Sequence, residues 1–264
     1  MCYRHAMGHK LKPPQPFDRF AVVADIHGNL PALEAVIDHI AARGIDAVVN
    51  LGDCLSGPLW PAETGAMLMA LDWPTIAGNH DRQLIDRPIG RMGRNDAHAA
   101  ARLTPELRSW LGLLPKTMIV AGNVFLCHGT PARDDACWLH RGTRGAMREA
   151  RPDEVAADAM DAPLALCGHT HLPRVVRLAD GRLIANPGSV GFPARQADLP
   201  SYHAEDVAEP HARYLIARRR DDGWAVELQA VAYDFEAAAR QAARNGRAKW
   251  ALALRTGQMP RKKN

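Results

Sequence analysis

Short apolar runs recur along the chain, and many are followed by a turn and then by a longer segment with apolar residues at helical spacing. Residues 20–24 form one such run, and uninterrupted runs of this length are typical of strands buried on both faces. Residues 30–37 follow with apolar positions at helical spacing, and Pro31 stands near the first turn, where proline fits a helix. The pattern therefore predicts a strand, a turn and a helix, which is the unit of an α/β fold.

The same alternation predicts the remaining elements. Strands are expected at 46–51, 75–77, 117–121, 124–127 and 164–167, and then at 174–178, 183–185, 214–219 and 225–231. Helices are expected at 62–71, within 82–114, at 143–160, at 235–244 and at 248–254. The prolines and acidic residues of 192–210 predict a long surface loop.

A chain of 264 residues is long enough to form one domain with a full core. We expect this α/β domain to span 18–257, with helical insertions at about 82–114 and 131–160. A loose N-terminal tail is expected at 1–17, and a basic tail at 258–264.

The composition excludes several classes of protein. Hydrophobic residues make up 47% and charged residues 23%, which is typical of a globular domain and not of a disordered chain. The net charge of +4 is scattered, so no nucleic-acid-binding stripe is predicted. No apolar run reaches the roughly 18 residues of a membrane span, and five cysteines without regular spacing do not indicate a disulfide framework. We expect a cytoplasmic protein without a membrane partner.

Five predicted strands end in polar segments that carry metal-binding side chain types. The segments are Asp25-Ile26-His27, Gly52-Asp53, Gly78-Asn79-His80-Asp81, His128 and Gly168-His169-Thr170-His171. Side chains two apart in extended backbone point the same way, so Asp25 and His27 are expected to face one ion. Imidazole, carboxylate and amide ligands without a thiolate suit Mn, Fe or Zn rather than a cysteine-rich structural site.

Seven candidate ligands are too many for one tetrahedral ion and fit two ions that share a carboxylate. The seven are Asp25, His27, Asp53, Asn79, His128, His169 and His171. Two ions about 3.5 to 4 Å apart can clamp a phosphate group, and a hydroxide held between them can attack phosphorus in line.

Each candidate ligand also has an ordinary structural role open to it. Asp25 is suited to cap the following helix, Asn79 to a turn, and His128 to a hydrogen-bonded place in the core. The recurrence of such segments at five strand ends favours the metal site over these roles. His140, beyond the His128 loop, is a weaker candidate for the rim of the site.

The five ordered segments resemble those of the calcineurin-like metallophosphoesterases, from about Arg19 to Val190, and the C-terminal part is similar to a bacterial and archaeal branch of small phosphodiesterases. The resemblance implies a four-layer αββα sandwich, in which helices flank two mixed β-sheets. By the same resemblance, one ion is held by Asp25, His27 and His171, a second by Asn79, His128 and His169, and Asp53 bridges them. His80 stands where the family has a histidine that binds no metal and assists the leaving group or steadies charge in the transition state.

One segment departs from the protein-phosphatase branch of this family. That branch reads G-D-x-x-D-R-G, whereas Ser56, Gly57 and Pro58 replace the D-R-G here. His80 therefore lacks the aspartate partner of that branch, and phosphate lacks its arginine. A protein phosphatase is disfavoured, and the group that orients His80 is left open.

The sequence predicts a dinuclear metal-dependent phosphoesterase that acts on a small phosphate ester, with a phosphodiester expected first. A metal-bridging hydroxide is the expected nucleophile. Manganese is the expected metal, with Fe, Zn, Ni or Co as alternatives. A phosphomonoesterase or nucleotide pyrophosphatase with the same centre is one alternative, and a non-catalytic protein-interaction scaffold on the same fold is another. The residues that bind the rest of the substrate are not predicted.

Overall fold

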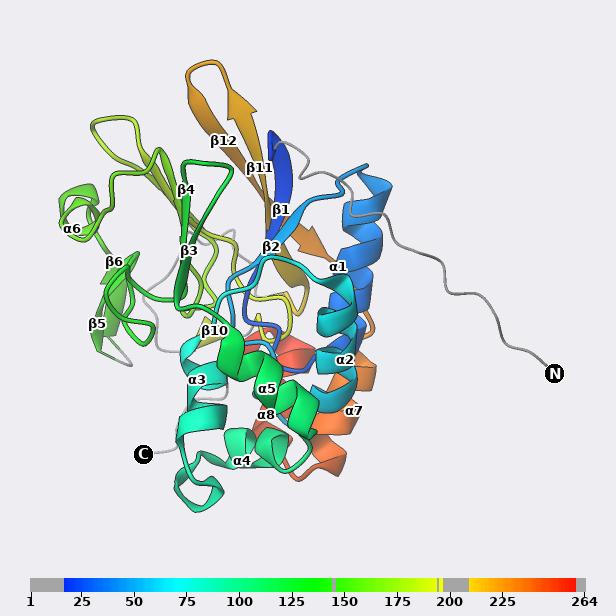
Figure 1. Ribbon diagram of the computed structural model, residues 1–264. Helices are drawn as coiled ribbons and strands as arrows, with labels where there is room; N and C mark the ends of the chain where they lie inside the picture. The colour runs from blue at the N-terminus through cyan, green and yellow to red at the C-terminus, as the bar shows by residue number, and fades with distance from the viewer. Residues whose placement is uncertain (1–16, 144–145, 194, 197–208, 260–264) are drawn as a thin grey trace.

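The computed structural model describes residues 17–143, 146–193, 195–196 and 209–259. Most of the predicted N-terminal tail, residues 197–208 of the predicted surface loop and the last five residues lie outside this description. Two β-sheets face each other at the centre of the molecule (Figure 1). Helices cover one outer face, and a short helix with a hairpin covers the other, so the predicted four-layer α/β sandwich is confirmed.

The first sheet is mixed and has the strand order β12-β11-β1-β2. β1 runs parallel to β2 and antiparallel to β11. The strands are β1 (Arg19–Val23), β2 (Val48–Asn50), β11 (Ala212–Arg220) and β12 (Gly223–Val231). Helices α1 (Leu30–Ala42), α2 (Pro61–Leu71) and α7 (Phe235–Arg244) lie on its outer side, as Figure 1 shows.

The second sheet is also mixed and has the order β3-β4-β7-β9-β8. Its three middle strands are parallel, and the two edge strands are antiparallel to their neighbours. The strands are β3 (Thr117–Val120), β4 (Val124–Cys127), β7 (Leu164–Leu166), β8 (Arg174–Arg177) and β9 (Leu183–Asn186).

Alternate residues of the central strands enter different cores, which explains their uninterrupted apolar sequences. In β1, Phe20 and Val22 pack between the two sheets, where Leu126 of β4 also lies. Ala21 and Val23 of β1 face the helices on the other side. Because both faces of these strands are buried, their carboxyl ends are held rigidly, and the polar segments of the sequence follow directly from them.

The insertion at 82–114 is helical, as predicted. It contains α3 (Asn79–Asp86), the 3₁₀ helix η1 (Ile89–Arg91), α4 (Arg94–Ala100) and α5 (Pro105–Leu113). Thr104 caps α5 by accepting a hydrogen bond from the Leu107 amide at 3.3 Å, which is the usual role of threonine at this position.

The helix predicted at 143–160 is wrong over most of its length. Strands β5 (His140–Thr143) and β6 (Ala146–Glu149) form an antiparallel hairpin, and only α6 (Pro152–Ala156) is helical. Trp138 and Leu139 are buried against the outer face of the second sheet, and the Leu139 carbonyl accepts from the Ala150 amide at 3.0 Å. Tertiary packing therefore overrides the helical propensity of the residues in β6.

Two smaller predictions also need correction. The strand expected at 75–77 contributes only a single bridge, between Thr75 and Asn50. The first two residues of the C-terminal tail expected at 258–264 form β13 (Gln258–Met259), which pairs with β10 (Arg195–Gln196), and the rest of that segment lies outside the described residues. Before it, α8 (Ala248–Thr256) packs against α7.

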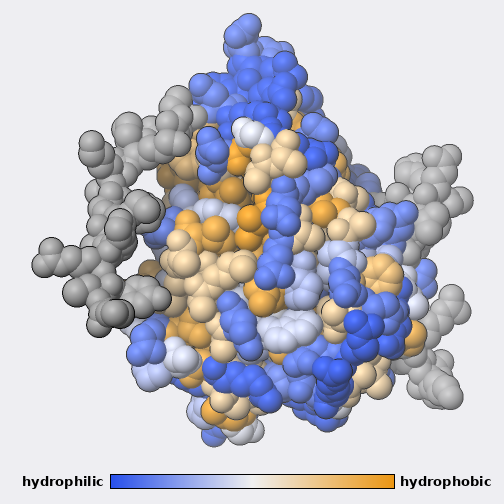
Figure 2. Space-filling view, turned by 90° about the vertical axis from the view of Figure 1, so that its right-hand side faces the viewer, coloured by the Kyte–Doolittle hydropathy of each residue, from blue (hydrophilic) through white to orange (hydrophobic). Residues whose placement is uncertain are grey.

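The surface is hydrophilic at the projecting end of the β11–β12 hairpin, at the top of Figure 2. Residues 218–222 at this end are all charged and exposed. Elsewhere on this side of the molecule, hydrophobic and hydrophilic residues are intermixed (Figure 2). Over the described ranges, none of the helices combines the length and apolar composition that crossing a membrane requires.

Gly52 and Gly181 offer a matched test of how closely the site loops are packed. Gly52 has φ +92°, and a Cβ there would lie 2.3 Å from the Gly78 nitrogen, whereas Gly181 has φ +90° with nothing within 4 Å. Gly181→Ala is expected to cost about 1 kcal/mol of unfolding free energy, because it strains only the backbone. Gly52→Ala is expected to cost about 3 kcal/mol or more, since the loops must also separate. Urea denaturation of both metal-free variants measures the difference, and equal losses would show that the close approach is unimportant.

Candidate metal centre

Five of the seven predicted ligands lie in loops with an unusual backbone conformation. Asp25, His27, Asp53, His169 and His171 all have φ between +51° and +68°. This left-handed region is unfavourable for residues with a side chain, and it persists only where the surrounding structure imposes it. The structure places Asp25 and His27 close together, but the reason given for it was wrong: β1 ends at Val23, and neither residue is extended.

Asn29, not Asp25, caps helix α1. Its Oδ1 accepts from the Ala32 amide at 3.4 Å, and its Nδ2 donates to the Gly191 carbonyl at 2.8 Å. The alternative role of Asp25 as the helix cap is thereby excluded, and the Asp25 side chain is available to the site.

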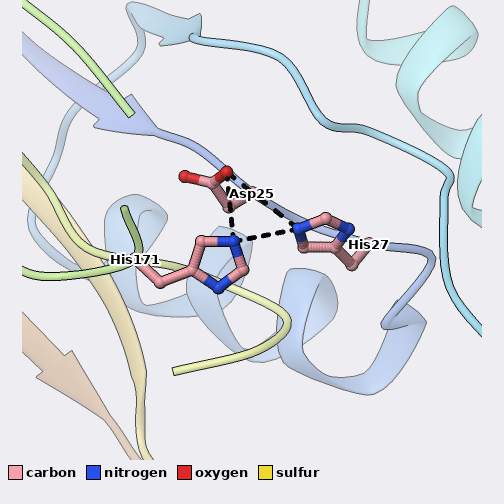
Figure 3. A group of neighbouring side chains, drawn as sticks. All are labelled: Asp25, His27 and His171. Carbon is pink, nitrogen blue, oxygen red and sulfur yellow. Dashed lines mark hydrogen bonds and ion pairs between the residues drawn. The ribbon is translucent and has the colours of Figure 1, made fainter. Parts of the chain in front are cut away.

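Asp25, His27 and His171 form a first cluster (Figure 3). His171 Nε2 lies 3.4 Å from Asp25 Oδ1 and 3.1 Å from His27 Nε2. His27 Nε2 lies 4.0 Å from Asp25 Oδ1. The three ligand atoms come from two loops of different sheets and point toward one another, which is the arrangement a single ion requires.

Backbone carbonyls fix the tautomers of the histidines in this cluster. His27 Nδ1 donates to the Ser56 carbonyl at 2.7 Å, and His171 Nδ1 donates to the Phe192 carbonyl at 2.7 Å. Because a carbonyl can only accept, the proton is on Nδ1 and the lone pair of each neutral ring is on Nε2. Two lone pairs facing each other at 3.1 Å repel unless a proton or a cation lies between them, and the pKa of His171 is raised by Asp25 against the effect of burial, which favours a proton in the metal-free site. The donor set also fits a metal ion.

Asp53, His128 and Asp25 form a second cluster. His128 Nε2 lies 3.3 Å from Asp53 Oδ2, and the same oxygen lies 3.9 Å from His27 Nε2 in the first cluster. Asp53 thus lies between the two clusters. Asp25 Oδ1 and His128 Nε2 are buried without a hydrogen-bond partner among the described residues. Buried polar atoms normally have partners, and these two would be satisfied either by protonated histidines, since His171 lies 3.4 Å from Asp25 Oδ1 and His128 3.3 Å from Asp53, or by bound cations.

Asn79 and His169 complete the set of seven. Asn79 Oδ1 lies 2.9 Å from His169 Nδ1, and the ring of His169 lies 5.6 Å from that of His128 between centroids. Asn79 is the first residue of α3 and does not follow a strand. The structure therefore brings all seven predicted ligands to one place, although one of them reaches it from a helix.

The charges in the metal-free site suit metal binding at both carboxylates and at His27, but not at His128. Burial opposes ionisation of Asp25 and Asp53, but the neighbouring histidines, His171 for Asp25 and His128 for Asp53, lower both pKa values. Burial and the nearby His171 lower the pKa of His27 to about 4. Burial also opposes protonation of His128, yet Asp53 and then Asp25 raise its pKa to about 10. At neutral pH the carboxylates are therefore ionised and His27 is neutral, which are the forms that bind metals, whereas His128 carries a proton that an ion must displace.

Asp81 supports the site without entering it. Its carboxylate accepts from the backbone amides of Asp53 at 2.7 Å, Cys54 at 2.9 Å and Gly78 at 3.0 Å. These bonds join the loop that carries Asp53 to the loop that precedes Asn79. The sequence places Asp81 in a motif but gives no sign of this role.

Asp96 orients His80, which answers the question that the missing D-R-G segment raised. Asp96 Oδ1 accepts from His80 Nδ1 at 2.8 Å, and Asp96 also accepts from the Ser56 hydroxyl. Burial lowers the pKa of His80, but Asp53 and Asp96 outweigh it and raise this pKa to about 9. Asp96 lies on α4 in the helical insertion, where no motif surrounds it, so sequence reasoning missed it.

The C-terminal part of the chain holds α4 in place. Arg247 donates from Nη2 to the Arg94 carbonyl at 2.7 Å and from Nε to Asn95 Oδ1 at 3.1 Å. His140, the weaker candidate for the rim, is buried in β5 and belongs to neither cluster.

Residues 19–209, well over half of the chain, match the family model of the calcineurin-like phosphoesterase superfamily domain. The chain belongs to this superfamily. It is 25% identical over 252 residues to an uncharacterised protein of Methanocaldococcus jannaschii, covering 87% of this chain and 94% of that protein. It also resembles the crystal structure of a metallophosphoesterase from Sphaerobacter thermophilus, with a TM-score of 0.70 and 26% identity over 90% of this chain and 98% of that one. The calcineurin-like phosphoesterases are metal-dependent hydrolases, and the two clusters are the candidate metal-ligand groups of this member.

The role of Asp81 predicts a stability loss at a residue that binds no metal. Asp81→Ala removes the acceptor of three buried amides, each costing roughly 1–3 kcal/mol when unsatisfied, so a loss of about 3 kcal/mol or more is expected. Asp86→Ala, at the exposed end of the same helix, is the control and is expected to stay within about 0.5 kcal/mol of the parent. Chemical denaturation measures both, and a small loss for Asp81→Ala would mean that the loops hold together by other contacts.

Proposed function

We propose that this protein hydrolyses phosphodiesters with two divalent ions, for which manganese is the first choice. Asp25, His27 and His171 would hold one ion, Asn79, His128 and His169 the other, and Asp53 would bridge them. The observation that carries the proposal is the pair of Nε2 atoms of His27 and His171, 3.1 Å apart, with each Nδ1 donating to a carbonyl. When bound, such ions activate water as a nucleophile and neutralise charge on the phosphoryl group.

Hydrogen bonds within the chain orient the two carboxylates. Asp25 Oδ2 accepts from the His169 amide at 3.1 Å, which leaves Oδ1 for the clusters. Asp53 Oδ1 accepts from the His80 amide at 2.8 Å, which leaves Oδ2 between His27 and His128. The ligand oxygens are thus positioned before any ion or substrate binds, and little reorganisation is needed during the reaction.

His80 is the candidate general acid. Asp96 binds its Nδ1, so Nε2 is on the side of the ring turned away from Asp96. The side chain is 35% exposed and its ring lies 5.7 Å from that of His27 between centroids, so it stands at the mouth of the first cluster. A protonated imidazole held there would donate a proton to the departing oxygen.

The segment at 56–58 favours a diester over a monoester. Ser56 binds Asp96, and Gly57 packs so closely that a Cβ would lie 2.3 Å from the His27 carbonyl oxygen. The segment therefore supports the site, and it contains no arginine whose paired N–H groups could bind the two charged oxygens of a phosphate monoester. A phosphomonoesterase with the same centre is the alternative, and so is a scaffold that binds proteins without catalysis.

Metal removal and a pair of chromogenic substrates test the proposed function. Chelation is expected to abolish hydrolysis, and Mn²⁺ to restore it better than Mg²⁺, which resists imidazole-rich sites. The kcat/KM for bis-p-nitrophenyl phosphate is expected to exceed that for p-nitrophenyl phosphate. A clear reversal would establish the monoesterase, and a metal-loaded protein without hydrolysis of either ester would favour the scaffold.

The pairing of His80 with Asp96 predicts a loss that depends on the leaving group. His80→Ala is expected to lower kcat on an alkyl diester by about 10²- to 10⁴-fold, and less on a nitrophenyl diester, whose leaving group departs without a proton. Asp96→Asn is expected to reproduce this pattern more weakly, because it lowers the pKa of His80 and disturbs its orientation but leaves the imidazole in the site. Metal content should be unchanged in both variants, with Asp86→Asn as the control. Equal losses on both substrates would show that His80 stabilises phosphoryl charge and does not protonate the leaving group.

A further inference from the structure

A cleft of about 180 Å³ opens beside the second cluster. It shares His128 with the metal centre, and its other principal lining residues are Arg82, Lys116, Thr117, Arg133 and Asp134. Of the ten residues that line the cleft, three are cationic and two, Asp134 and Asp135, are acidic. Except for His128, these residues lie outside the five motif segments: Arg82 is in the first insertion, residues 131–135 are in the second, and Lys116 and Thr117 lie at the start of β3 between the two.

The fold holds the walls of the cleft in position. The Pro115 carbonyl accepts from the Ala77 amide at 2.8 Å, which fixes the backbone next to Lys116 against the loop that leads to Asn79. On the opposite wall, a Cβ on Gly129 would lie 2.5 Å from the Arg133 carbonyl oxygen. Only glycine lets this loop fold back so tightly onto the residue that follows His128.

Two of the three cations are paired, and the third is not. Arg82 forms a two-pronged pair with Asp134, with Nε at 2.6 Å and Nη2 at 2.8 Å from its oxygens. Arg133 lies 3.0 Å from Asp135, which also lines the cleft. Lys116 makes no ion pair within the described ranges. The cleft therefore carries one uncompensated positive charge, on Lys116.

The pair with Asp134 also positions Arg82 as a donor. Arg82 stands one helical turn after Asn79 on α3, and Asp134 occupies its Nε and Nη2. Its Nη1 makes no hydrogen bond to the rest of the described chain. A fixed guanidinium with a free N–H group beside a lysine is a combination that binds phosphate oxygens.

We infer that this cleft binds a second phosphate group, and that the substrate is a diphosphate-linked ester. The inference rests on the proposed function, because it places the attacked phosphorus at the two clusters. A group bound in the cleft lies next to His128, so only a short link joins it to that phosphorus, as in a diphosphate. The attacked phosphorus of such a substrate still carries two ester or anhydride links, in keeping with a diesterase.

Two chromogenic substrates with the same leaving group test the inference. One is the p-nitrophenyl ester of thymidine 5′-phosphate, and the other is the β-p-nitrophenyl ester of thymidine 5′-diphosphate, which adds one phosphate. Lys116→Gln is expected to lower kcat/KM roughly tenfold on the diphosphate ester, as loss of one charge-assisted contact predicts, and to leave the monophosphate ester unchanged. Lys249→Gln removes the same charge from an exposed position on α8, outside the cleft, and is expected to change neither rate.

Calorimetry of the metal-loaded protein tests the cleft independently of turnover. Lys116→Gln is expected to weaken binding of α,β-methylene-ADP roughly tenfold and to leave binding of AMP unchanged. If the parent hydrolyses neither ester, the proposed function fails, and the calorimetric difference still decides whether the cleft binds a second phosphate. Equal affinity of the parent and Lys116→Gln for α,β-methylene-ADP, or equal losses on both esters, would overturn the inference.

Discussion

The three backbone hydrogen bonds that Asp81 accepts are the interaction on which the site depends. They join the loop after β2 to the start of α3, and these two segments carry Asp53, Asn79 and His80. Gly52 and Gly78 allow the segments to approach closely, since any side chain there would collide with backbone or with Asp53. The buried Asp81 carboxylate therefore sets the spacing between Asp53, Asn79 and His80. These are the candidate bridging ligand, a second candidate ligand and the candidate general acid.

Outside the family motifs, other parts of the chain complete the site. Asp96 reaches His80 from the helical insertion, and Arg247 fixes α4 from the segment between α7 and α8, beyond the residues that match the family model. Both insertions contribute to the wall of the cationic cleft, through Arg82 in the first and residues 131–135 in the second, and the first also positions the candidate acid. The family motifs contain the candidate ligands, whereas Asp96, Arg247 and most of the cleft residues lie outside those motifs.

The sequence was sufficient for the layers of the fold and for naming seven candidate ligands that the structure brings to one place. Buried strands such as β1 and β4 have uninterrupted apolar runs, and the ligands follow them in short segments with recognisable order. It was insufficient where an element depends on distant partners, as in the hairpin of β5 and β6, which owes its form to packing on the second sheet. Asp96 could not be found for a similar reason, because a carboxylate on a polar helix is indistinguishable from a solvated one until the helix is placed. The left-handed conformation of Asp25 and His27 likewise has no signature in residue type.

The ligands come from both sheets, and this has a consequence for how the protein acquires its metals. Asp25 and His171 lie far apart in sequence and meet only when the core between the sheets has formed. Such non-local contacts form late, because the chain must first close long loops. A partly folded chain would offer only isolated ligands from one sheet, with low affinity for any ion. The complete site therefore exists only in the fully folded protein. The rate of high-affinity metal binding during refolding would then report the rate of the last folding step, in which the two sheets come together.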